Sequence, residues 1–261
     1  MELEIISREP REKRFETPLL FVHGSCGAAW NWDENFLPHF AENGFSAHAV
    51  SLRGHGASET PANFNSTSVS DYVADVVQAA RSLPRPPVLI GHSLGGLIVQ
   101  KFLEKYEAAV GILLCSVPVG GMFKPSLPWQ LKSPLLRTKV MLKKDYRLLF
   151  STPQRAREFL FSEDTNETLV ARYAARFGQE SYRIGFETVF NLPKPALINT
   201  PMLVIGTAGD TLISRKFIEK TARAYRADCK IFPRLGHAVM LERDWRQVAD
   251  FMIEWLAGKI R

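Results

Sequence analysis

The chain has 261 residues, of which 46% are hydrophobic and 23% charged, enough apolar material for a large buried core. This composition excludes a disordered or fibrous protein, and the length allows one large domain or a core with a sizeable insertion. The net charge is +6, but residues 117–198 hold 13 basic and 7 acidic residues and so contain the whole excess. No zinc spacing, RNA-binding signature or phosphate-binding glycine loop accompanies that charge, so nucleic acid is not an expected partner.

The cysteines and the N-terminal residues indicate the cellular compartment. Cys26, Cys115 and Cys229 are too few for a disulfide framework, which favours a reducing environment. The N-terminal residues are acidic where a secretory signal would be basic and apolar, and no run approaches the ~18 apolar residues of a membrane-spanning helix. The sequence therefore predicts a soluble, cytoplasmic protein.

Strands and helices are expected to alternate along most of the chain. Short apolar runs rich in branched residues, bounded by turn residues, predict buried strands at 18–24, 45–52, 86–93, 109–116, 201–207 and 229–233. Apolar residues at helical spacing predict helices at 32–43, 70–82, 94–107, 214–225 and 242–257. This alternation is typical of an α/β protein with a mostly parallel twisted sheet flanked by helices.

The alternation stops in the middle of the chain. Between Val117 and Ile198, longer helical patterns carry many aromatic, leucine and basic residues, which predicts a helical insertion at 118–198 in a core formed by 1–117 and 199–261. The run from Lys139 to Leu149 has apolar and basic residues at helical spacing. Charged residues on such a helix usually form a solvated face, and a weak contact with an anionic surface or attraction of an anionic substrate is the alternative.

The segment Gly91-His92-Ser93-Leu94-Gly95-Gly96 has the pattern G-x-S-x-G of a nucleophile elbow. A strand that turns sharply into a helix holds its central residue in a strained conformation and needs small flanking residues. The predicted strand before this motif and the predicted helix after it supply the required context. Ser93 is therefore the candidate nucleophile.

A serine hydroxyl needs a general base and a group that orients the base. His237 follows the last predicted strand, and Asp210 directly follows the strand before it. Either residue alone could simply be part of a loop. Ser93, Asp210 and His237 each lie at the end of a predicted strand, however, and this shared placement favours one common site. We therefore predict a triad of Ser93, Asp210 and His237, with no metal ligands and no cofactor.

The oxyanion of acyl transfer needs preorganised hydrogen-bond donors. The backbone amide of Leu94 is one candidate, and that of Ser25, in the loop after the first predicted buried strand, is the other. His23 in this loop is expected to be a buried anchor rather than a proton carrier, and Cys26 to pack or line a pocket. Arg53 and His55 are expected to hold their own loop.

These motifs resemble the α/β-hydrolase fold superfamily. The matching residues are HG at 23–24, RGHGAS at 53–58, GHSLGG at 91–96, GTAGD at 206–210 and GH at 236–237. The resemblance spans 18–117 and 199–258 and leaves the insertion to match the family's helical cap. It implies the roles given above for Ser93, Asp210, His237, Ser25 and Leu94. Many members carry Asp where this chain has Ser51, which affects a loop contact.

Within the superfamily, several reactions are open. The loop HGSCGAAWNW is similar to that of plant-type methylesterases and hydroxynitrile lyases, but such lyases carry Lys where this chain has Ala238. Epoxide hydrolases and haloalkane dehalogenases of this fold need a carboxylate in place of Ser93. The prediction is a serine hydrolase for a carboxylic ester with an apolar acyl or similar group. Hydrolysis of a C–C bond, lactone or thioester, a lyase step in quinone biosynthesis, and a non-catalytic ligand-binding protein are the alternatives.

Overall fold

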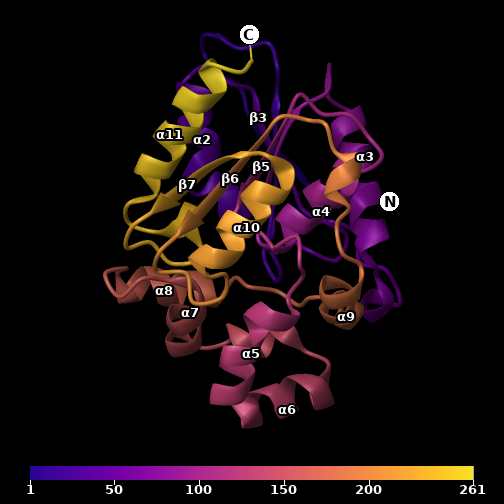
Figure 1. Ribbon diagram of the computed structural model, residues 1–261, viewed down its shortest axis with the longest axis vertical. Coiled ribbons are helices and arrows are strands. Elements are labelled where there is room, and N and C mark those ends of the chain that lie inside the picture. The colour runs from indigo at the N-terminus through magenta and orange to yellow at the C-terminus, as the bar shows by residue number, and fades with distance from the viewer. Residues whose placement is uncertain (261) are drawn as a thin grey trace.

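In residues 1–260, which the computed structural model describes, seven strands form one twisted sheet (Figure 1). Their order across the sheet is β1-β3-β2-β4-β5-β6-β7. Only the edge strand β1 (Ile5–Arg8) is antiparallel to its neighbour, β3 (Ala47–Val50). The parallel strands, besides β3, are β2 (Leu19–Val22), β4 (Val88–His92), β5 (Val110–Leu114), β6 (Met202–Thr207) and β7 (Asp228–Phe232). The α/β architecture expected from the sequence is confirmed.

Helices cover both faces of the sheet because successive strand side chains point to opposite sides. Leu19 and Phe21 of β2 enter one apolar core, which α2 (Phe36–Glu42) and α11 (Trp245–Ala257) cover. Leu20 and Val22 enter the other core. The helices over that second core are α3 (Val69–Arg81), α4 (Leu94–Leu103) and α10 (Arg215–Tyr225).

The five helices between β5 and β6 lie beyond one end of the sheet, at the bottom of Figure 1. They are α5 (Phe123–Lys132), α6 (Pro134–Lys143), α7 (Pro153–Leu160), α8 (Glu167–Ala174) and α9 (Tyr182–Phe190). The chain enters this segment from the carboxyl end of β5, the edge at which parallel strands position functional loops. Within residues 1–260, no helix has the length and apolar character needed to cross a bilayer.

The predicted elements differ from the observed ones in identifiable places. All six predicted strands are present, but β1 was missed because it is a four-residue edge strand with mostly exposed side chains. The predicted helix at 32–43 is two helices, α1 (Trp30–Asp33) and α2, because Asn35 leaves the helical conformation with φ −141°. The predicted helix at 94–107 ends at Leu103.

The loop after β3 is held by buried polar contacts. Arg53 donates from its Nη2 to Asp75 Oδ1 (2.7 Å), and its backbone amide donates to the same carboxylate (2.9 Å). Ser51 accepts a hydrogen bond from the amide of Ala29 (2.9 Å) and donates to the Glu4 carboxylate. Glu4 thus brings a carboxylate to Ser51, the position where the resemblance implied Asp. The expected anchoring role of Arg53 is confirmed.

Candidate active site

Ser93 stands at the sharp turn between β4 and α4. Its φ of 51° and ψ of −116° depart from every regular conformation, which is the strain expected at a nucleophile elbow. The turn is fixed by hydrogen bonds from the Ser93 amide to the carbonyl of Leu114 (3.1 Å) and from the Val117 amide to the Ser93 carbonyl (3.0 Å). A Cβ added to Gly91 would meet the Gly95 carbonyl oxygen at 2.4 Å, so the flanking glycines are required by close backbone approach.

Asp210 and His237 meet at the same edge of the sheet. Asp210 follows β6, and His237 follows β7, so both loops leave the carboxyl ends of neighbouring strands. His237 Nδ1 donates to Asp210 Oδ2 at 2.8 Å, with both side chains buried. The other carboxylate oxygen accepts hydrogen bonds from the amides of Leu212 (2.8 Å) and Ile213 (2.9 Å). Because Nδ1 carries the proton, Nε2 of His237 is left as a proton acceptor.

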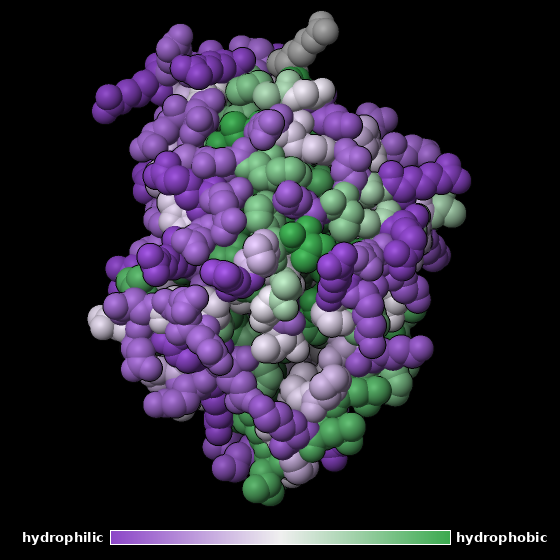
Figure 2. Space-filling model, turned by 60° about the vertical axis from the view of Figure 1, so that its left-hand side comes forward, coloured by the Kyte–Doolittle hydropathy of each residue, from purple (hydrophilic) through white to green (hydrophobic). Residues whose placement is uncertain are grey.

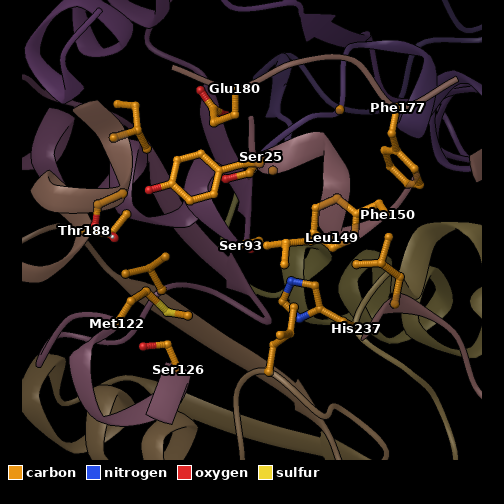
Figure 3. Close-up of a pocket in the computed structure, with 18 of the residues that line it drawn as sticks. Ser25, Ser93, Met122, Ser126, Leu149, Phe150, Phe177, Glu180, Thr188 and His237 are labelled. Carbon is orange, nitrogen blue, oxygen red and sulfur yellow. Dashed lines mark hydrogen bonds between the residues drawn. The ribbon is translucent and has the colours of Figure 1, made fainter. Parts of the chain in front are cut away.

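The imidazole of His237 and the side chain of Ser93 line the same pocket and lie next to each other (Figure 3). Among the described residues no hydrogen bond joins them. Such contacts are often long in enzymes without substrate and shorten when substrate binds. The structure thus brings the three predicted triad residues to one place.

Two side chains that the sequence analysis did not single out hold the loop of His237. His92, the residue before Ser93, donates from Nε2 to the His237 carbonyl at 2.9 Å. Burial lowers the pKa of His92 well below its usual value, with His237 adding to the effect, so the ring stays neutral. Glu242 accepts hydrogen bonds from the amides of Gly236 (2.7 Å) and Ser162 (2.6 Å). The loop is therefore tied both to the elbow and to the segment between β5 and β6.

The loop that was predicted to supply an oxyanion donor also reaches the pocket. Ser25 lines it beside Gly24 and Gly27, and Figure 3 shows Ser25 next to Ser93. His23 donates from Nδ1 to the Gly24 carbonyl (2.8 Å) and accepts from the Leu52 amide (3.0 Å). Burial lowers the pKa of His23 to about 3, so it is a neutral anchor as predicted.

The second predicted donor, the Leu94 amide, is the first of α4 and follows Ser93 directly. In the described part of the chain neither this amide nor that of Ser25 donates a backbone hydrogen bond. Cys26, the neighbour of Ser25, is fully buried, and burial raises the pKa of its thiol well above the usual value. Cys26 therefore packs rather than acts as a nucleophile.

The pocket beside Ser93 has a volume of about 270 Å³ and lies between the sheet edge and the helices that follow β5. Its walls are mainly apolar, and those from the middle segment include Met122, Trp129, Leu149, Phe150 and Phe177. The carboxylate of Glu180 also borders the pocket but is hydrogen-bonded to the Tyr72 hydroxyl (2.6 Å) and the Ser181 amide (2.8 Å). In Figure 3 it points away from Ser93.

Cys115, Asp210 and His237 could each offer one atom to a metal ion, because these atoms lie within 4.8 Å of one another. The chemistry does not fit one. Burial, reinforced by Asp210, raises the pKa of the Cys115 thiol well above its usual value, so the thiol is neutral beside the Asp210 carboxylate. The ring nitrogen that faces Asp210 is already used in the hydrogen bond between them. We therefore assign Cys115 to the packing around the carboxylate of Asp210.

Comparison with known proteins gives the family. The family model described as "Alpha/beta hydrolase family" matches residues 19–251, which is most of the chain. The chain belongs to the alpha/beta hydrolase family. The fold class and the family resemblance drawn from the motifs are therefore confirmed.

Individual relatives of this alpha/beta hydrolase match shorter stretches. Methylesterase 3 of Arabidopsis thaliana is 27% identical over 128 residues, which is 48% of this chain and 47% of that protein. The non-heme chloroperoxidase of Streptomyces lividans is 34% identical over 105 residues, covering 39% of this chain and 37% of that protein. The matches thus span about half or less of these curated relatives.

Solved structures agree over nearly the whole chain. A thermophilic esterase from Thermogutta terrifontis superposes with a TM-score of 0.77 at 18% identity, covering 99% of this chain and 94% of the other. An esterase from Exiguobacterium antarcticum gives the same TM-score at 16% identity, covering 98% and 95%. At these identities the likeness establishes the fold.

Proposed function

We propose that this protein is a serine hydrolase that cleaves a carboxylic ester. The observation that carries the proposal is one arrangement: a strained serine at a strand-to-helix turn shares an apolar pocket with a histidine whose Nδ1 is bonded to a buried carboxylate. The similarity to methylesterases and esterases supports the same reaction class.

The proposed reaction has two steps. Ser93 Oγ attacks the ester carbonyl while His237 Nε2 takes its proton, and the backbone amides of Ser25 and Leu94 stabilise the oxyanion. The imidazolium then gives that proton to the leaving alkoxide, which departs as the alcohol. In the second step His237 takes a proton from water as the water oxygen attacks the acyl-enzyme, and it gives this proton from water to Ser93 Oγ as the carboxylic acid leaves. Asp210 orients the imidazole and stabilises its charged form.

The helices of residues 118–198 act in this proposal as a cap. They supply the apolar wall opposite the sheet edge, so they exclude water and favour a substrate with an apolar acyl group. One carboxylate oxygen of Glu180 accepts from the Tyr72 hydroxyl, and the other lies 3.5 Å from His55 Nε2. All three cysteines are free thiols, in keeping with a cytoplasmic location.

A fluorophosphonate probe tests the nucleophile. The probe should label the wild type and fail to label Ser93→Ala, whereas Ser25→Ala, the matched change at another pocket serine, should keep its labelling because only the backbone of Ser25 is assigned a role. Labelling that persists in Ser93→Ala refutes the assignment.

Substrate profiling tests the bond. A panel of esters of graded acyl length, run beside lactones, thioesters and a diketone, should show the esters turned over fastest. Faster turnover of a lactone, a thioester or the diketone would leave the proposed triad unchanged but would change the proposed substrate class to that one. No labelling and no turnover would indicate a ligand-binding member of the family.

A further inference from the structure

The hairpin formed by α5 and α6, residues 123–144, exposes an unusual amount of apolar surface. Its exposed large apolar side chains and their exposed fractions are Phe123 58%, Leu127 38%, Leu131 75%, Leu135 79%, Met141 56% and Leu142 79%. Figure 2 shows hydrophobic side chains gathered at the lower end of the molecule, where Figure 1 places these two helices. A contiguous apolar patch on a folded protein indicates a surface that another body covers.

Every charged residue among these 22 residues is basic. They hold six lysine and arginine residues and no acidic residue: Lys124, Lys132, Arg137, Lys139, Lys143 and Lys144. All six are exposed, and within the described residues Lys132 is the one that forms a salt bridge, with Glu158 at 3.0 Å. Five positive charges therefore stand unpaired among the exposed apolar side chains.

This combination of exposed apolar and basic side chains favours one kind of binding partner. A second copy of the chain would bring two hairpins of the same charge together, because a two-fold interface pairs each surface with itself. A merely solvated helix face would not need six exposed large apolar side chains. An anionic lipid bilayer matches both properties, since its phosphates attract lysine and arginine while the acyl boundary accepts leucine, methionine and phenylalanine.

The hairpin also forms part of the pocket wall. Trp129 of α5 and Val140 and Met141 of α6 line the pocket that contains Ser93. The surface that would meet lipid and the wall that would meet substrate therefore belong to the same two helices. We propose that the α5–α6 hairpin docks the protein on anionic lipid bilayers, with its apolar side chains at the acyl boundary and its basic side chains at the headgroups.

Vesicle sedimentation tests the proposal. The 261-residue chain with Ser93→Ala is used so that lipid turnover does not alter the vesicles, and the result does not depend on the proposed reaction. We expect binding to vesicles of equal parts phosphatidylcholine and phosphatidylglycerol, little binding to phosphatidylcholine alone, and a decrease on addition of salt. Because each basic residue near the surface contributes about fivefold, Lys139→Glu with Lys143→Glu should weaken binding at least about tenfold.

Matched variants separate docking from general charge attraction. Arg81→Glu with Lys105→Glu makes the same change in net charge on two exposed residues, one at the end of α3 and one just after α4, and it should leave binding unchanged. Leu135→Ser with Leu142→Ser should weaken binding several-fold without lowering the melting temperature, because both side chains are 79% exposed.

Three results would overturn the proposal. The first is binding to anionic vesicles no stronger than to phosphatidylcholine alone. The second is equal weakening by the charge reversals on the hairpin and by those at Arg81 and Lys105. The third is a dimer in analytical ultracentrifugation that Leu135→Ser with Leu142→Ser dissociates while vesicle binding is absent, which would assign the hairpin to a second copy.

Discussion

Gly95→Ala perturbs the elbow by one methyl group. Gly95 is the second residue of α4, and a Cβ there would lie 2.3 Å from the Val22 carbonyl oxygen and 2.5 Å from that of His23. Real Cβ contacts essentially never fall below 3.0 Å, so α4 and the end of β2 must separate by about 0.7 Å. The obstacle is backbone on both sides, so no side chain can rotate away. The displaced segment leads directly into the loop of Ser25.

The expected cost follows from this displacement. Alanine favours a helix over glycine by about 1 kcal/mol, so any loss comes from the clash. Overpacking of this kind costs about 1–3 kcal/mol, which corresponds to a decrease in melting temperature of about 2–6 °C for a chain of this size. Because a misplacement of about 1 Å at the reacting groups can cost about 10²-fold in rate, kcat for an ester should fall by about one to two orders of magnitude.

The assay compares thermal unfolding and ester hydrolysis of Gly95→Ala with those of Gly258→Ala. The control is sound because a Cβ at Gly258 has its nearest neighbour at 3.6 Å, an ordinary contact, and the backbone φ there is −84°. The control should match the wild type in both measurements. A Gly95→Ala protein with unchanged melting temperature and unchanged kcat would refute the argument that the elbow depends on this close approach.

Three further predictions concern the triad, the pocket and the buried side chains of His55 and Glu180. Asp210→Asn should lower kcat for an ester about 10⁴-fold, because an amide does not hold His237 in the required tautomer. Steady-state kinetics that give a kcat within tenfold of the wild type would contradict this prediction. Phe150→Ala removes a buried side chain of the pocket wall and should destabilise the protein by about 3–5 kcal/mol in urea unfolding. It should also shift the preferred ester to a longer acyl chain, and an unchanged chain-length profile would count against Phe150 as pocket lining. Burial opposes the charged form of His55, but Glu180, 3.5 Å away, outweighs it and raises the pKa of His55 above 6.5. The stability that the charged His55 contributes is therefore present below pH 6.5 and is lost as pH rises through the raised pKa. In urea unfolding, the stability difference between the wild type and His55→Gln should shrink toward alkaline pH. A difference that stays constant with pH would refute this link between charge and stability.

Local patterns in the sequence were enough for most of the fold. The buried parallel strands are continuous apolar runs because both of their faces are covered, and such runs stand out between turn residues. Edge strand β1 has neither property, since residues 5–8 are mostly exposed and lie at the border of the sheet. The break at Asn35, whose side chain donates to the Met240 carbonyl (2.9 Å), is likewise not visible in the spacing of apolar residues, which continues through it.

The candidate site was only partly visible in the sequence. Ser93 could be found because the elbow imposes glycines at fixed positions, and Asp210 and His237 because each follows a strand. His92 and Glu242 were missed, since their partners are the carbonyl of His237 and the amides of Gly236 and Ser162. The residue before Ser93 in the motif is unrestricted, so no local rule marks His92 as a contact to a loop 145 residues away.

The sequence by itself determined the alternating elements, the elbow and the chain order of serine, aspartate and histidine, because these depend on neighbours within a few residues. Tertiary structure alone decided the shape and apolar character of the pocket, the anchoring of the histidine loop and the exposure of the α5–α6 hairpin. Leucines at helical spacing look the same in sequence whether they face a core or water. Only the packing of α5 and α6 leaves Leu131, Leu135 and Leu142 exposed while Leu136 and Val140 are buried.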